Sequence, residues 1–203
     1  MGFPISQKIW RDFSIMKNHY EQILKKIYQK TELFLKEKYD RSLPFQDGFF
    51  DRFERAKRLG FGNKTSIYNS AHVFGNVKIG KNTWIGPYVI LDASGGTIDI
   101  GDFCSISAGC HIYTHDSVHW SLSGGNSKAA TAPVKIGSNV YIGAQSVIKH
   151  GVVIGSQCVI GANSFINSDV PDNTIFVGTP AKKIGTVSVN ESTHEVKLNY
   201  DKS

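Results

Sequence analysis

The residues best suited to acid–base chemistry gather in one irregular stretch, which reads IYTHDSVHWSLSGG over residues 112–125. It holds His115 and His119 together with Asp116 and Trp120. An imidazole titrates near neutral pH, so a histidine can accept a proton in one step of a reaction and return it in the next. Asp116 could orient an imidazole or cap a turn, and the Trp120 ring could stack on a sugar or a base. The stretch is a candidate catalytic segment, and a histidine that only hydrogen-bonds locally is the alternative.

A repeat with a period of six residues occupies the sequence on both sides of this stretch. Fourteen units begin with a large aliphatic residue, seven of them continue with Gly, and twelve have Ala, Val, Thr, Cys or Ser in the fifth place. A fixed period of this length is typical of stacked repeats, in which each unit buries its apolar residues against its neighbours. The units begin at Ile67, Val73, Ile79, Ile85, Leu91, Ile100, Ile106, Ile112, Ile136, Ile142, Ile148, Ile154, Ile160 and Ile166.

Each unit is long enough for one short strand and a corner, and three units close a triangular coil. Residues eighteen positions apart then stack, which predicts that Ile136 pairs with Ile154 and that Ile142 pairs with Ile160. Glycine suits the corners because it tolerates backbone angles that other residues avoid. The repeat therefore predicts a prism of short parallel strands around an aliphatic core.

Two stretches of these units, VKIGSNVYIGAQSVI at 134–148 and IFVGTPAKKIG at 175–185, resemble the hexapeptide-repeat acyltransferases. The resemblance extends over residues 67–185 and implies a mainly β fold, a left-handed parallel β-helix. The left-handed sense comes from the resemblance alone, because crossovers between parallel strands are usually right-handed. The loop residues THDSVHW and SGG are more loosely similar to those of bacterial nucleotide-aminosugar N-acetyltransferases.

Three parts of the chain follow from this assignment. Residues 1–62 form an N-terminal helical segment, residues 63–185 form the β-helix with an extruded loop at 113–133, and residues 186–203 form a short polar tail. In the N-terminal segment an apolar stripe predicts an amphipathic helix, and Asp47 could cap a second helix through Leu59. These helices either cover the open edge of the first coil or contribute to the acceptor site. The stripe consists of Ile9, Phe13, Met16, Tyr20, Ile23 and Ile27.

The resemblance implies that His115, where the loop leaves the repeat, is the catalytic base. It would accept a proton from the acceptor's hydroxyl or amine as that group attacks a thioester carbonyl, and it could then protonate the leaving thiolate. The resemblance also implies that Asp92, in the interrupted unit LDASGGTID, lies on the acceptor side. We expect Asp116, His119 and Trp120 of the loop to shape the same side. Burial of His119 and Trp120 against a neighbouring subunit is an equal alternative.

Acetyl-CoA, or another acyl-CoA, is the co-substrate that the resemblance implies. Two alanines match positions whose backbone would meet the pantetheine arm, and two lysines match the surroundings of the coenzyme's phosphates, where a cation is chemically sensible. The residues expected to bind the coenzyme are Ala144, Ala162, Asn167, Ser168, Lys182 and Lys183. A solvated surface lysine is the alternative for Lys182.

Apolar residues also recur at positions that should point outwards, because side chains alternate along a strand. Tyr141 should stack with Val159, and Val147 with Phe165. Exposed apolar strips usually mark an interface. The resemblance implies that such faces assemble a homotrimer, with the acyl-CoA in the groove between neighbouring prisms, so we expect active sites between subunits.

Composition narrows the class of partner. The net charge of +6 lies mostly in residues 1–60, where thirteen basic residues face eight acidic ones, which is typical of solvated helices and argues against nucleic acid. No stretch is apolar enough to span a membrane, and no signal peptide is evident. All three cysteines occupy the small fifth place of a unit, so we expect buried free thiols in a cytoplasmic protein. They are Cys104, Cys110 and Cys158.

The most favoured function is N-acetylation of a nucleotide-linked amino sugar. O-acetylation of a polysaccharide or small sugar is the alternative, and the acceptor stays open because Gly86 stands where the family has an acceptor-contacting Asn. Zinc-dependent carbonic anhydrases share this prism, but the spacing of His111, His115 and His119 brings nothing together on a strand and a loop, so we expect no metal. A scaffold without activity would leave the loop unexplained.

Overall fold

The computed structural model describes the backbone of residues 7–201 and the side chains from residue 16 onward. The chain divides into two compact units, residues 1–51 and 52–203. Within residues 7–201, no helix combines the length and the apolar character that crossing a membrane requires.

The first unit consists of the long helix α1 (Gln7–Tyr39) and the short helix α2 (Phe45–Phe49). The Tyr28 hydroxyl donates a hydrogen bond to the Leu43 carbonyl, and the Tyr28 ring lies 5.9 Å from that of Phe45, which ties the two helices together. The predicted helix therefore forms. Of its stripe residues, Met16, Tyr20 and Ile23 are exposed and Ile27 is partly buried. Ile9 and Phe13 lie outside the described side chains.

The prediction of one second helix capped by Asp47 is wrong. Helix α2 begins after Pro44, whose fixed φ suits a helix start, and Asp47 lies inside the first turn, where its charge favours the helix terminus. The helix then ends because Phe50 is extended, and a separate helix α3 (Arg52–Arg58) follows.

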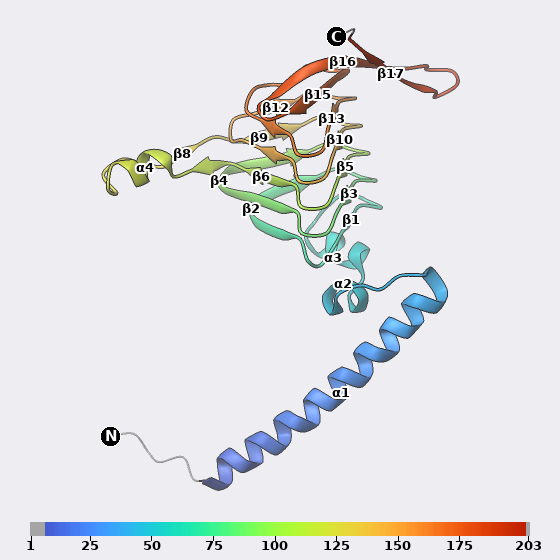
Figure 1. The fold of residues 1–203 in the computed structure, drawn as a ribbon, viewed down its shortest axis with the longest axis vertical. Helices are drawn as coiled ribbons and strands as arrows, with labels where there is room; N and C mark the ends of the chain where they lie inside the picture. The colour runs from blue at the N-terminus through green and yellow to red at the C-terminus, as the bar shows by residue number, and fades with distance from the viewer. Residues whose placement is uncertain (1–6, 202–203) are drawn as a thin grey trace. The chain divides into compact units, whose positions relative to one another are not determined.

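Helix α3 belongs to the second unit and lies against the first coil of its β-helix (Figure 1). The Arg55 guanidinium donates hydrogen bonds to the carbonyls of Tyr68 and Ala71, and Ala56 is almost fully buried. These contacts occupy backbone carbonyls at the open end of the prism. Helix α3 thus covers the first coil.

The second unit is a parallel β-helix with three faces, and its coils are stacked from β1 to β15 (Figure 1). The first face consists of β1 (Ser66–Ile67), β3 (Trp84–Ile85), β5 (Ser105–Ile106), β10 (Tyr141–Ile142), β13 (Val159–Ile160) and β15 (Thr174–Gly178). The second and third faces share the long strands β2 (His72–Ile79) and β4 (Ile90–Ile100). The second adds β6 (His111–Tyr113), β11 (Val147–Ile148) and β14 (Phe165–Ile166), and the third adds β9 (Val134–Ile136) and β12 (Val153–Ile154).

The predicted stacking register is confirmed. Ile136 pairs with Ile154, and Ile142 pairs with Ile160. The outward residues pair in the same way, Tyr141 with Val159 and Val147 with Phe165. Three six-residue units therefore make one turn of the chain.

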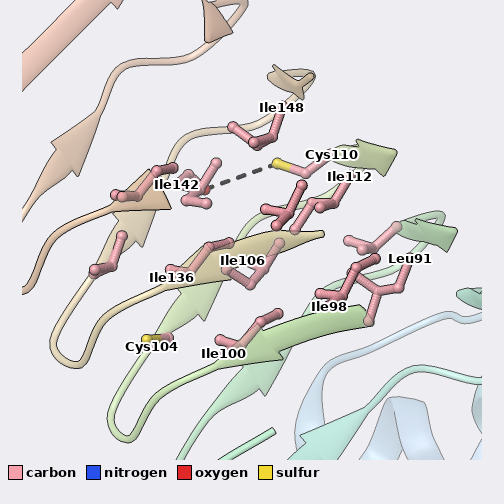
Figure 2. Packing of buried hydrophobic residues seen from close by; sticks show 14 of the residues in the cluster. Leu91, Ile98, Ile100, Cys104, Ile106, Cys110, Ile112, Ile136, Ile142 and Ile148 are labelled. Atoms are coloured by element: carbon pink, nitrogen blue, oxygen red, sulfur yellow. Dashed lines mark hydrogen bonds between the residues drawn. The ribbon is translucent and has the colours of Figure 1, made fainter. Parts of the chain in front are cut away.

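The core follows the repeat equally closely. Every aliphatic position that begins a unit is buried except Val73, which is partly exposed. Figure 2 shows several of these side chains, from Leu91 to Ile148, in the interior of the prism together with two of the cysteines. All three cysteines are buried and free, as predicted, and burial raises the pKa of their thiols. Burying one such aliphatic side chain contributes about 1.5–3 kcal/mol, so the stacked core accounts for much of the stability.

Two excursions leave this regular pattern. The extruded segment is an arm rather than an irregular loop: β7 (His115–Asp116) pairs with β8 (Ala130–Thr131), and helix α4 (Val118–Leu122) lies between them (Figure 1). The C-terminal segment, expected as a polar tail, forms an antiparallel hairpin of β16 (Ala181–Val189) and β17 (Val196–Tyr200).

Candidate active site

The His115 side chain lies where the arm leaves the second face of the β-helix. Strand β6 ends at Tyr113, Thr114 is fully buried, and β7 begins at His115. The imidazole Nδ1 is buried without a hydrogen-bond partner and lies 3.9 Å from Asp92 Oδ1. The side chains of His115 and Asp92 are 34% and 17% exposed, so the ring keeps access to solvent while the carboxylate is largely enclosed.

Strand β4 of the coil below fixes this geometry. The Thr114 N–H and hydroxyl both donate to the Asp92 carbonyl, and the Gly95 N–H donates to the Thr114 hydroxyl. Asp92 Oδ1 also accepts a hydrogen bond from the Ser94 N–H at 3.0 Å. The residue before His115 is therefore held by β4, and the Asp92 carboxylate is held in place by its own turn.

A second carboxylate–imidazole pair lies beside the first. His150 Nε2 lies 2.7 Å from Asp116 Oδ2, and Asp116 Oδ1 accepts a hydrogen bond from the Val118 N–H at 3.1 Å. The hydrogen bond with His150 is the main cause that holds the pKa of the Asp116 carboxyl below its usual value, followed by the bond from Val118. Both carboxylate oxygens are thus already engaged within the protein.

These groups line one cavity of about 390 Å³. Its polar side chains come from the arm and from two later coils, and its apolar wall is the stacked pair of Val147 and Phe165. The volume is within the range of small-molecule sites. The cavity is lined by Tyr113, His115, Asp116, Val118, Val147, Lys149, His150, Phe165 and Asn167. One of the two apolar strips predicted from the sequence therefore forms a wall beside His115.

The structure brings some of the predicted site residues together and leaves others apart. Asp92 and Asp116 lie near His115, and Asn167 lines the same cavity. His119 and Trp120 lie exposed on α4 and do not line it. The other expected coenzyme contacts lie elsewhere on the β-helix: Ala144 and Ala162 at corners that follow β10 and β13, Ser168 after β14, and Lys182 and Lys183 exposed on β16.

This β-helix and its cavity have counterparts among known proteins. A family model described as Bacterial transferase hexapeptide (six repeats) matches residues 133–168. The galactoside O-acetyltransferase of Escherichia coli (strain K12) is 29% identical over 139 residues, which cover 59% of this chain and 68% of that protein. The hexapeptide-repeat-containing acetyltransferase VCA0836 from Vibrio cholerae O1 biovar eltor, solved with acetyl coenzyme A, matches over 92% of both chains at 26% identity and a TM-score of 0.60. The chain is similar to the hexapeptide-repeat acyltransferases, and these similarities identify it as an acyl-CoA-dependent acetyltransferase.

A third similar protein is AntD, an N-acyltransferase from Bacillus cereus, solved in complex with dTDP and 3-hydroxybutyryl-CoA. It matches 68% of this chain and 90% of its own length at 27% identity, with a TM-score of 0.54. Putative acetyltransferases of Staphylococcus aureus match at 36% to 37% identity, and the chain spans only 54% to 63% of their length.

The prism of this acyltransferase is the left-handed β-helix that the resemblance implied, so the predicted fold class is confirmed. The enzyme takes its acyl group from an acyl-CoA thioester. Among the described residues, no three His, Cys, Asp or Glu side chains are arranged to hold a metal ion. His111 instead lies against Tyr113, with its Nδ1 3.3 Å from the hydroxyl.

Sequence reasoning missed His150 in this acyltransferase. The stacking register could have indicated it. Ile112 pairs with Ile148, which lies 36 positions later because the arm is inserted between the two coils. The same offset places His150 one coil above Thr114, and therefore beside His115 and Asp116. A search of the next coil at this offset would have found it.

Proposed function

We propose that the enzyme transfers an acyl group, most simply acetyl, from acyl-CoA to the amine of a nucleotide-linked amino sugar, with His115 as the general base. The observation that carries the proposal is the one-third exposed imidazole of His115 in a cavity of about 390 Å³, with its buried Nδ1 facing the Asp92 carboxylate. Similarity to AntD, an N-acyltransferase that binds dTDP, supports a nucleotide-linked amine as acceptor.

The reaction follows from the two nitrogens of this ring. With Nδ1 against Asp92, Nε2 is the atom offered to the acceptor. The amine attacks the thioester carbonyl, its proton passes to Nε2, and the carbon–sulfur bond breaks as the amide forms. The imidazolium then returns the proton to the departing thiolate. Asp92 stabilises the imidazolium, because an opposite charge at this distance favours the charged form of a ring.

The substrates would meet at His115 from two sides. We assign Asp92, His119 and Trp120 to the acceptor side, the last two reaching it from the exposed arm. We assign the coenzyme to the groove that runs along the later coils, and Asn167 supports this assignment because it lines the cavity of His115. The groove would be closed by a second subunit of a cytoplasmic homotrimer. The expected coenzyme contacts are Ala144, Ala162, Asn167, Ser168, Lys182 and Lys183.

O-acetylation of a sugar is the second candidate, and the similarity to a galactoside O-acetyltransferase favours it. One experiment separates the two. The purified enzyme is incubated with acetyl-CoA and either dTDP-linked amino sugars or plain sugars, and free thiol is followed over time. Thiol release that requires the amino group, with the N-acetyl product identified by mass, supports the proposal. Turnover of plain sugars alone would instead establish the O-acetyltransferase.

A further inference from the structure

The Asp116–His150 pair makes the tightest described polar contact in the cavity, yet the chemistry proposed above uses neither group. His150 Nε2 and Asp116 Oδ2 are 2.7 Å apart although the residues are 34 positions apart in the sequence. The other oxygen of the same carboxylate accepts the Val118 N–H at the first turn of α4. One carboxylate thus bridges the arm and the next coil of the β-helix.

The two ends of this bridge differ in how firmly the protein holds them. His150 lies at the corner between β11 and β12, and the flanking Ile148 and Ile154 are buried in the core. The arm joins the β-helix at Thr114, which donates to the Asp92 carbonyl, and its own two strands are held together by only a two-residue ladder of β7 and β8. The rigid β-helix is therefore the anchor, and the arm is the part whose position the pair can set.

The position of the arm affects His115 most directly, because His115 precedes Asp116 in the two-residue strand β7. A shift of the Asp116 backbone must move the His115 backbone with it. The Asp92 Oδ1 atom lies 3.9 Å from His115 Nδ1, a distance too long for a hydrogen bond. The contact between Asp116 and His150 is thus shorter than the contact between Asp92 and His115.

We propose that Asp116 and His150 are positioning residues that set the place of His115 in the cavity. The inference rests on the proposed role of His115 as the base. A carboxylate with a depressed pKa stays ionised, and hydrogen bonds to ionised groups are short and strong, which suits an anchor. Misplacing a reacting group by about 1 Å can lower a rate by about 10²-fold, so the loss of the anchor should reduce turnover even though neither residue touches a reacting atom.

A double-mutant cycle tests this role. Asp116→Ala and His150→Ala should each lower kcat by roughly 10- to 100-fold and leave the KM for acetyl-CoA within about twofold of wild type. The double variant should be no slower than the slower single variant, because both remove the same contact. Exchanging the partners, Asp116→His with His150→Asp, should recover part of the lost turnover. Asn126→Ala removes a polar contact at the far end of the arm and serves as the control, with unchanged kcat.

Three results would overturn the proposal: His150→Ala with kcat within twofold of wild type, losses that multiply in the double variant, or a melting temperature that falls without any change in kcat. If the alanine variants do not fold, His150→Phe keeps the volume of the ring without its nitrogens and should show the same loss of kcat. His115→Ala is assayed alongside. Full turnover of that variant refutes the base and its positioning together, whereas loss in His115→Ala with full turnover in His150→Phe refutes only the positioning.

Discussion

Gly95 lies so close to His115 that a methyl group on its α-carbon would come within 2.6 Å of the histidine Cβ. The same methyl would lie 2.6 Å from the Thr114 carbonyl oxygen, which is backbone and cannot turn away. The nine-residue unit in β4 therefore has a structural reason for its glycine: only a residue without a side chain lets the strand pass directly beneath the proposed base.

Gly95→Ala should therefore displace His115. We expect kcat to fall by about 10- to 100-fold, because the added methyl must move the start of the arm, and the melting temperature to fall by several degrees. Ser94→Ala is the matched control, because Ser94 is exposed and its hydrogen bond to Asp92 comes from the backbone N–H. Wild-type kcat and melting temperature in Gly95→Ala would show that the close approach does not constrain the site.

His115→Ala should lower kcat by roughly 10²–10⁴-fold, the usual contribution of a positioned general base. The melting temperature should change little, because the side chain is one-third exposed and belongs to no core cluster. If the acceptor is an amine, the loss should shrink as pH rises, since a larger fraction of the amine is then deprotonated in solution. A pH–rate profile of both proteins measures this, and near-wild-type turnover at neutral pH would remove His115 as the base.

Lys182→Ala should raise the KM for acetyl-CoA several-fold and change kcat little, because a phosphate contact is present equally in the ground and transition states. Lys182 is exposed on β16, and Lys197 on the neighbouring strand β17 offers a control with the same charge and exposure. Lys197→Ala should leave both constants unchanged. Equal KM values for the two variants would assign Lys182 to the solvated surface.

The stacking of the β-helix could be predicted from the sequence to the level of individual pairs. Ile136 with Ile154 and Val147 with Phe165 followed from the period alone, because a coil of fixed length leaves no freedom of register. The hairpin of β16 and β17 could not be predicted in this way. The repeat ends before it, and β17 has no buried face to impose an alternating pattern.

The candidate site was predictable only in part, for a related reason. His115 was marked by the point where the repeat breaks, and Asp92 by the interrupted unit. The contact between Asp116 and His150 depends on how the arm folds back on the next coil, and the arm carries no periodic pattern that records this. Whether α4 brings His119 and Trp120 to an acceptor depends equally on what lies beside the arm.

The apolar strip on the first face should assemble the enzyme into a trimer. Tyr141 is 48% exposed and stacks with Val159, which presents an apolar surface to solvent in the single chain. Light scattering should report about three times the chain mass of 22.4 kDa. Tyr141→Asp should shift this mass towards the monomer. Val153→Asp on the third face should not, because Val153 pairs with Lys135 and forms no strip. A monomeric wild-type enzyme with full activity would refute both the interface and the shared site.

The ionisation of Asp116 should make part of the stability depend on pH. Its pKa in the folded protein is depressed below the ordinary value of 3.8, mainly by His150, so the unfolded chain binds the proton more readily. The stabilisation is therefore fully present above about pH 4 and is lost as pH falls through the folded-state pKa.

Asp116→Asn cannot titrate, so its stability should depend less on pH in this range. The measurement is the difference in melting temperature between wild type and Asp116→Asn at pH 6 and at successively lower pH. We expect the wild-type advantage to shrink steadily as pH falls below about 4, whereas an advantage that stays constant with pH would show that the charge of Asp116 contributes nothing to the contact.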